Sequence, residues 1–130
     1  MTDIMFNITE LQSIKNILQY YDYFNNPDNV FFTTTTFSGA EYTKEVYDFM
    51  SILIKEKFVL PGFDWASWDE GRKILKDSTN IMSSDLLTLK KLLTAIVRND
   101  RFCAGAFGGF AKNGKLGLIL KRMSELIANN

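Results

Sequence analysis

The segment SSDLLTLKKLLTAIVR, residues 83–98, carries the clearest structural pattern in this chain of 130 residues. Its apolar residues recur every three or four positions, so they share one face of a helix. Ser83 or Ser84 can cap this helix, and Asp85 would then lie in its first turn, where a negative charge is favourable. We therefore predict a helix that buries one face in a core. This apolar face consists of Leu86, Leu89, Leu93, Ile96 and Val97.

Two more predicted helices are preceded by sequences typical of a capping box. The first box, residues 9–12 (TELQ), would open a helix near 10–23. The second, residues 38–41 (SGAE), precedes a helix whose apolar face runs over 46–54. In both, a hydroxyl can accept from the amide three residues later, and the side chain at that later position can reach back.

Three further helices complete the prediction. Asp64 can cap a short helix in which Trp65 and Trp68, three residues apart, share a face. An acid is unfavourable near the end of a helix, so we expect Asp100 to begin a new segment and to cap a helix that starts near Arg101. An Asn-Gly turn then leads into the last helix. Its apolar face consists of Leu116, Ile119, Leu120, Met123 and Ile127.

Residues 30–37 (VFFTTTTF) differ from the rest of the chain, because they are rich in β-branched and aromatic residues. They are either a short strand or an extended segment that lies on the helices. We favour the extended segment, since no second strand-like run offers partners for its backbone groups. The sequence thus predicts one compact all-α domain over 1–130, with five or six helices and at most this one short extended segment.

The residue types that are absent limit the chemistry. The chain has no histidine and one cysteine, Cys103, which excludes histidine-based triads, histidine metal ligands, an internal disulfide and the common structural zinc sites. We predict no catalytic, cofactor-binding or metal-binding residue and favour a protein that is not an enzyme. We expect no membrane segment and no signal peptide, and hence a cytoplasmic protein. An enzyme built on Asp64, Asp69, Glu70 and the arginines remains a hypothesis, which we rank third behind the two binding functions given at the end of this section.

Charge is unevenly distributed along the chain. Residues 1–70 contain four basic and eleven acidic residues, and residues 71–130 contain eleven basic and four acidic ones. The charges mix on the folded surface, or copies associate head to tail, or the basic half contacts a polyanion. In the last case Arg98 and Arg101 would contact phosphates and the tryptophans would stack on bases. The other candidate phosphate contacts are Lys90, Lys91, Lys112, Lys115, Lys121 and Arg122.

The segment before the last helix combines charge with small residues. Arg98 and Arg101 lie three residues apart at a predicted corner between helices, where they either brace the corner through hydrogen bonds or face an anion. We favour bracing. Three glycines follow within five residues, at 105, 108 and 109, and close packing of helices explains them better than a ligand does.

The runs FDWASW (63–68), DLLTLKKLLTAIVRNDRFCAGAF (85–107) and NGKLGLILKRM (113–123) resemble a small bacterial family of uncharacterised proteins, a domain of unknown function. The resemblance covers about 58–123, and its features are a DWxxW segment and an LLTxxVRxDRFxxG motif. The family pattern has an acid where this chain has Ala104. The resemblance implies no activity, but it implies that its residues form one constellation. The candidate constellation is Asp64, Trp65, Trp68, Arg98, Asp100, Arg101, Phe102 and Gly105.

Two functions follow as hypotheses. The first is a non-enzymatic accessory factor that binds another protein or a second copy of itself. The alternative is a nucleic-acid-binding protein that uses the basic second half.

Overall fold

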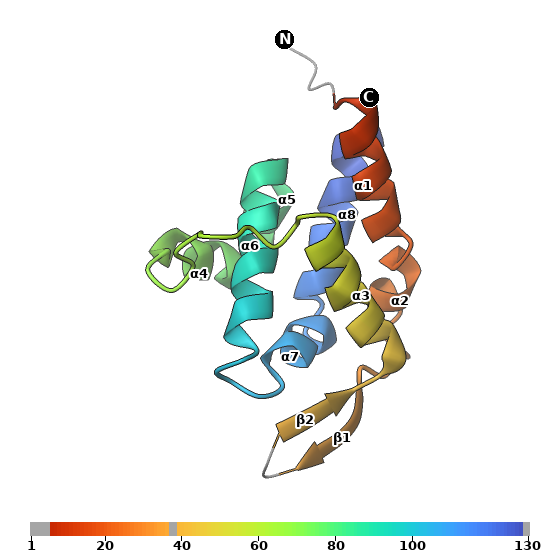
Figure 1. Ribbon diagram of the computed structural model, residues 1–130, viewed down its shortest axis with the longest axis vertical. Coiled ribbons are helices and arrows are strands. Elements are labelled where there is room, and N and C mark those ends of the chain that lie inside the picture. Colours follow the sequence, from red (N-terminus) through yellow and green to blue (C-terminus); the bar gives the residue numbers. More distant parts are fainter. Residues whose placement is uncertain (1–5, 37–38, 129–130) are drawn as a thin grey trace.

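The computed structural model describes residues 6–36 and 39–128, which form eight helices and one antiparallel pair of strands (Figure 1). The expected helical fold class is confirmed, but five or six helices was too low a number. The two extra short helices span only five residues each, too few for a periodic pattern. The elements are α1 (Ile8–Leu18), α2 (Tyr21–Asn25), β1 (Phe32–Thr36), β2 (Gly39–Tyr42), α3 (Lys44–Lys55), α4 (Asp69–Lys76), α5 (Ser78–Met82), α6 (Leu86–Asn99), α7 (Ala106–Lys112) and α8 (Lys115–Ala128).

Helix α6 is the helix that the leucine pattern predicts, and most of the predicted apolar face is buried. Its cap differs from the prediction. Asp85 is the N-cap residue, and its Oδ1 accepts from the Thr88 amide at 2.8 Å. Ser84 instead donates to the Asn80 carbonyl at 2.8 Å, because it lies at the end of α5. The helix therefore starts one or two residues later than predicted.

Helix α1 also starts elsewhere than the capping-box prediction placed it. Asn7 and Glu10 form the box, with the Glu10 amide 2.8 Å from Asn7 Oδ1. The prediction of a single helix near 10–23 was wrong, because the chain turns after Leu18 and the helix resumes as α2.

The preference for an extended segment over a strand at 30–37 was wrong for the described part of that range, because β1 has a partner that the sequence did not show. Strand β1 pairs with β2 in a register that places Phe32 opposite Tyr42. The capping box predicted at 38–41 was wrong for the described part of that range, since residues 39–41 belong to β2 and Thr43 is the N-cap of α3. Residues 37 and 38 lie outside the described part of the chain. A four-residue strand that begins Gly-Ala has little strand propensity of its own and depends on β1 for pairing.

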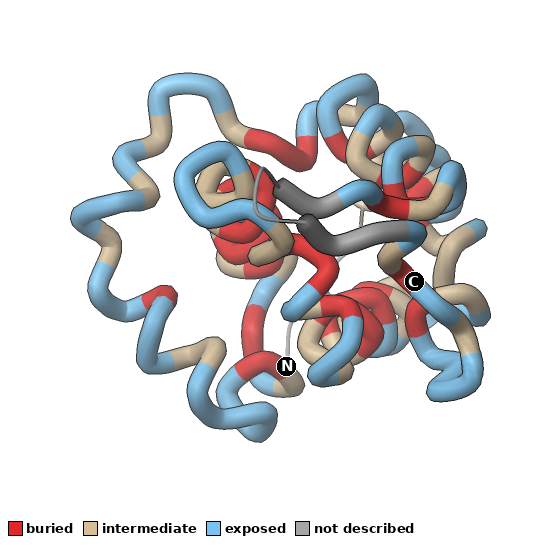
Figure 2. Tube along the Cα trace, turned by 90° about the horizontal axis from the view of Figure 1, so that it is seen from below, coloured by how far each residue is buried: buried red, intermediate tan, exposed pale blue. Residues whose placement is uncertain are grey.

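The core lies between the long helices, and buried residues gather where they face one another (Figure 2). Helix α8 packs against α1, α2, α5, α6 and α7. Phe49 of α3 is fully buried, and its ring centroid lies 4.6 Å from that of Phe24 and 6.1 Å from that of Phe107. Segments from both halves of the chain thus share one cluster of aromatic rings.

No helix within residues 6–36 and 39–128 is long and apolar enough to cross a membrane.

Candidate functional site

Asp100 connects three elements at the corner between α6 and α7. It is the C-cap residue of α6, and its Oδ1 accepts from the Tyr42 hydroxyl of β2 and from the Phe107 amide, the latter at 3.0 Å. The Tyr42 hydroxyl in turn accepts from the Gly108 amide at 3.2 Å. We call Tyr42, Asp100, Phe107 and Gly108 the Asp100 junction. Asp100 does satisfy the first turn of a helix, as predicted, but that helix begins at Ala106 and not near Arg101.

Tyr42 holds its proton in this junction. Its side chain is only 5% exposed. Burial raises the pKa of the Tyr42 hydroxyl well above its ordinary value, and the hydrogen bond to Asp100 raises it further. The hydroxyl is therefore a fixed donor to the carboxylate, and both groups serve to attach the β1–β2 strand pair to the α6–α7 corner.

The glycines of this segment serve different purposes. Gly105 precedes α7 with φ +87°, a left-handed conformation that favours glycine. Gly108 allows close packing: a Cβ there would lie 2.4 Å from Phe32 Cζ and 2.7 Å from Tyr42 Cε1. Gly109 has no such neighbour within 4 Å of its Cβ position. Close packing thus explains Gly108 but not Gly109.

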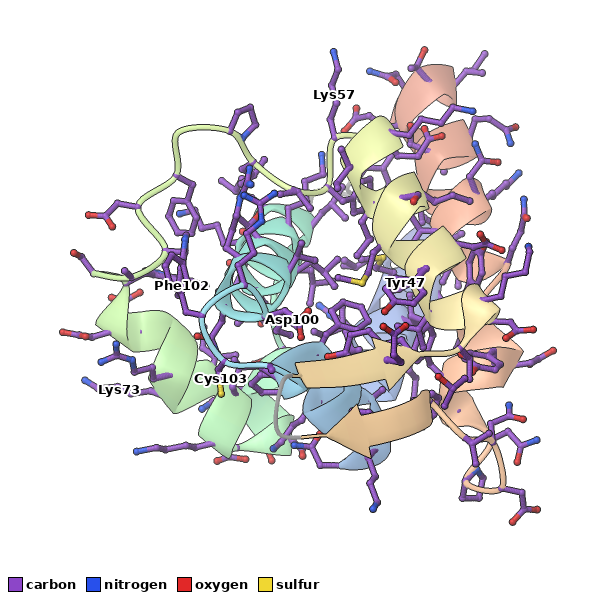
Figure 3. All side chains as sticks on the ribbon, turned by 60° about the horizontal axis from the view of Figure 1, so that its bottom comes forward. Tyr47, Lys57, Lys73, Asp100, Phe102 and Cys103 are labelled. Carbon is purple, nitrogen blue, oxygen red and sulfur yellow. The ribbon has the colours of Figure 1, made fainter. Side chains whose placement is uncertain are left out.

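Phe102 lies two residues after Asp100 but has the opposite environment. Its side chain is 80% exposed, on the connection between α6 and α7 (Figure 3). Its nearest aromatic neighbour is Trp65, with ring centroids 6.0 Å apart and planes inclined by 36°. The DWxxW segment and the RxDRF motif therefore meet through these two rings, which we call the Trp65–Phe102 pair.

The tryptophans are not on a helix, contrary to the prediction. Trp65 lies in an irregular turn, where Asp64 Oδ1 accepts from the Ser67 amide at 3.4 Å, and Trp68 is the residue before α4. The Trp68 ring is 5.4 Å from that of Phe63, and Lys91 Nζ lies 5.9 Å from the Trp68 centroid. Both indoles are half-buried, and together they form a wall opposite Ala95, Ile96 and Asn99 of α6.

A pocket of about 150 Å³ lies beside this wall. Its surface is largely apolar, and Arg72 and Asn99 supply its charged and amide groups. The Asn99 side chain makes no hydrogen bond with another residue of the described chain. The lining residues are Trp65, Trp68, Gly71, Arg72, Leu75, Ala95, Ile96, Asn99 and Phe110.

Arg98 and Arg101, in the segment RNDRF (98–102), have no bracing partner in the described part of the chain. Arg98 is half-buried and Arg101 is exposed, and neither guanidinium makes a hydrogen bond or ion pair with a described residue. Ala95 follows Lys91 by four residues and Arg98 follows Ala95 by three, so the three share the side of α6 that faces the tryptophans. Among the described residues the corner is braced by Asp100 and not by the arginines, contrary to the preferred interpretation.

The six other candidate phosphate contacts do not line one pocket. Lys90 lies over the Phe58 ring at 4.9 Å, while Lys112 lines a separate groove. Arg122 donates to the Ser84 carbonyl at 2.8 Å and so ties α8 to the segment before α6. The remaining three are Lys91, beside Trp68, and Lys115 and Lys121, on α8.

Sequence reasoning missed two features. Tyr42 had no predicted role, since no local pattern links it to Asp100, 58 residues later. A groove of about 550 Å³ lies between the α2–β1 connection and the α7–α8 turn, and no sequence pattern indicated it. No group of three or more metal-ligating side chains occurs among the described residues.

Comparison with known protein families gives a match over nearly the whole chain. The family described as "Family of unknown function (DUF6508)" matches residues 9–129, nearly the whole chain and more than the 58–123 over which the motifs indicated a resemblance. No curated protein and no solved structure matches. The chain belongs to this family of unknown function.

Proposed function

We propose that this protein is a cytoplasmic, non-enzymatic accessory factor that binds another protein, and that the Trp65–Phe102 pair and its pocket are the docking site. The observation that carries the proposal is the 80% exposure of Phe102 beside a half-buried tryptophan. Residues that dominate protein interfaces are typically tryptophan, tyrosine and arginine around a desolvated centre. Trp65 and the unpaired arginines 98 and 101 supply these types in one place.

The use of the acids near the site supports a non-enzymatic function. Asp100 is engaged with Tyr42 and Phe107, and Asp69 pairs with Arg72 at 3.4 Å. Asp64 accepts from the amide of its own turn. Each of these three acids is engaged within the described chain, and no acid is among the residues that line the pocket, so acid–base chemistry there has no carboxylate in place.

Identification of the partner tests the proposal. A photo-crosslinking amino acid at Ala104, which is exposed and two residues from Phe102, is compared with the same group at Ser51, exposed on α3. We expect one protein to crosslink at Ala104 and not at Ser51. With that protein purified, Phe102→Ala should weaken the dissociation constant at least ~10-fold, as expected for a central aromatic contact.

The matched control is Ile8→Ala, because Ile8 is also a large apolar residue and is 85% exposed. It should leave the affinity unchanged. The proposal is wrong if the captured protein binds the Phe102→Ala variant as tightly as the original. A crosslinked dimer of this chain as the sole product would instead make the site a self-association surface.

Nucleic acid is the second candidate, because exposed aromatic rings beside arginines also suit a stacked base with its phosphates. We rank it second, since Lys90, Lys112 and Arg122 lie on separate surface features. Fluorescence anisotropy with labelled single- and double-stranded DNA and RNA, titrated across salt concentration, separates the two. Micromolar binding that weakens steeply with salt and is lost in Phe102→Ala would favour nucleic acid over a protein partner.

A further inference from the structure

We infer that the pocket receives one apolar side chain, phenylalanine, leucine or isoleucine, from an acidic linear segment of the partner. The inference rests on the proposed docking site and adds the chemistry of what occupies it. The pocket's size, its free amide and the charge around it each support one part of this description.

The size of the pocket favours a single side chain. Its volume of about 150 Å³ is below the ~300–1,000 Å³ typical of sites for cofactors and drug-sized ligands. A cavity of this volume holds about one benzene ring. Leu75, Ile96 and Phe110 contribute aliphatic and aromatic surface to the lining, so an apolar group gains by entering it.

Asn99 can hold the main chain of such a segment. It lies on the last turn of α6, lines the pocket and makes no side-chain hydrogen bond with a described residue. An amide side chain offers one acceptor and two donors, which match the N–H and C=O groups of a peptide. The segment would therefore be held by its backbone at Asn99 while its side chain enters the pocket.

The charge around the pocket favours acids in the segment. Lys91 lies beside Trp68 at the rim, and Arg98 and Arg101 follow along the same corner, all three without an ion pair to a described residue. The nearby acids Asp64, Asp69 and Glu70 lie in the segment that leads into α4, and Asp69 pairs with Arg72. Asp100 directs its carboxylate to the Tyr42 hydroxyl and the Phe107 amide. The two guanidinium groups at the C-terminal end of α6 thus have no ion pair in the described chain, and guanidinium groups pair well with carboxylates.

A peptide-display selection on the purified protein tests the inference. Linear peptides of about twelve random residues are selected on the unmodified protein and counter-selected on Phe102→Ala, and their binding is measured by fluorescence anisotropy. We expect enriched peptides to share one Phe, Leu or Ile within two or three residues of an Asp or Glu. Replacement of the anchor by alanine should weaken binding at least ~10-fold.

Two variants of the protein separate the parts of the inference. Ala95→Leu places a larger side chain at the pocket wall without removing a charge, and it should weaken peptide binding at least ~10-fold, with an unchanged melting temperature to verify folding. The double variant Arg98→Gln with Arg101→Gln should weaken binding about 5- to 10-fold and reduce its salt dependence. Lys121→Gln, an exposed cation of α8, is the control and should have no effect.

Two outcomes overturn the inference. One is that the selected peptides bind with an affinity that does not depend on an acid in the peptide, on the arginines or on Ala95. The other is that the selection yields no peptide whose binding depends on Phe102. The proposed docking site fails separately. It fails only if the protein that crosslinks at Ala104 binds Phe102→Ala as tightly as the original, so the two failures are distinguishable.

Discussion

Asp100 and Phe102 are two residues apart in one motif, yet their surroundings are opposite. The carboxylate of Asp100 is held by the hydroxyl of Tyr42 and the amide of Phe107, so all of its contacts are internal. The ring of Phe102 is 80% exposed, and its one aromatic contact among the described residues is Trp65. The difference shows that the RxDRF segment combines two tasks: its acid fixes the corner, and its aromatic residue is presented on the outside.

The contrast extends to the residues that flank each position. The Asp100 junction joins β2, α6 and α7, and it includes a glycine that fits only because it lacks a side chain. Around Phe102, the guanidinium groups of Arg98 and Arg101 and the amide of Asn99 have no partner in the described chain. A change in the junction should therefore act on stability, and a change around Phe102 should act on binding.

The largest expected effect is that of Asp100→Ala. It removes a charged acceptor from two donors, and hydrogen bonds to charged groups contribute about 1.5–3 kcal/mol each. We expect the free energy of unfolding, measured with urea, to fall by about 3 kcal/mol. Asp100→Asn is the control, because its carbonyl oxygen still accepts, and it should lose about 1 kcal/mol. A loss below about 1 kcal/mol for the alanine variant would remove the distinction between the two positions.

Gly108→Ala should cost about 2 kcal/mol, because the new Cβ would overlap Phe32 and Tyr42 and overpacking costs about 1–3 kcal/mol. Gly109→Ala is its matched control on the next residue of α7. That position has space, and alanine should stabilise the helix by about 0.5–1 kcal/mol. Urea denaturation of both variants checks the sign, and equal effects would contradict the close packing of the hairpin on α7.

Tyr42→Phe should lower stability by about 1–2 kcal/mol near neutral pH, since it leaves Asp100 and the Gly108 amide short of a partner. Because the pKa of Tyr42 is raised on folding, the unfolded chain releases this proton first as the pH rises. The advantage of tyrosine over phenylalanine should be constant below the ordinary pKa of 10.0 and decline above it. An advantage that grows between pH 10 and 11 would show that the hydroxyl is not held as a donor.

The sequence predicted the elements whose signal is local. The apolar faces of α6 and α8 are buried largely as their spacing indicated, since a long stripe of leucine and isoleucine specifies one face. The starts of α1 and α6 were misplaced by one or two residues because several residues able to cap stand together, whereas those of α3 and α7 were misplaced by about five. Asn7 precedes Thr9, and Asp85 follows Ser84, and the path of the chain decides which of them caps.

The site was predicted only in part, because it depends on contacts distant in sequence. The resemblance grouped Trp65 with Phe102, and the structure brings these two rings together. The assignment of Asp100 and Phe102 to different tasks could not be predicted, since it depends on Tyr42 at the end of a strand with no propensity of its own.

Phe102→Ala tests the central claim most directly and should have the smallest effect on stability. Its unfolding free energy in urea is measured beside its affinity for the crosslinked partner. The account predicts a change in stability within about 0.5 kcal/mol, as for other exposed positions, together with the ~10-fold loss of binding expected for an interface anchor. A loss of stability above about 1.5 kcal/mol with unchanged binding would contradict it and make Phe102, like Asp100, a residue that holds the fold.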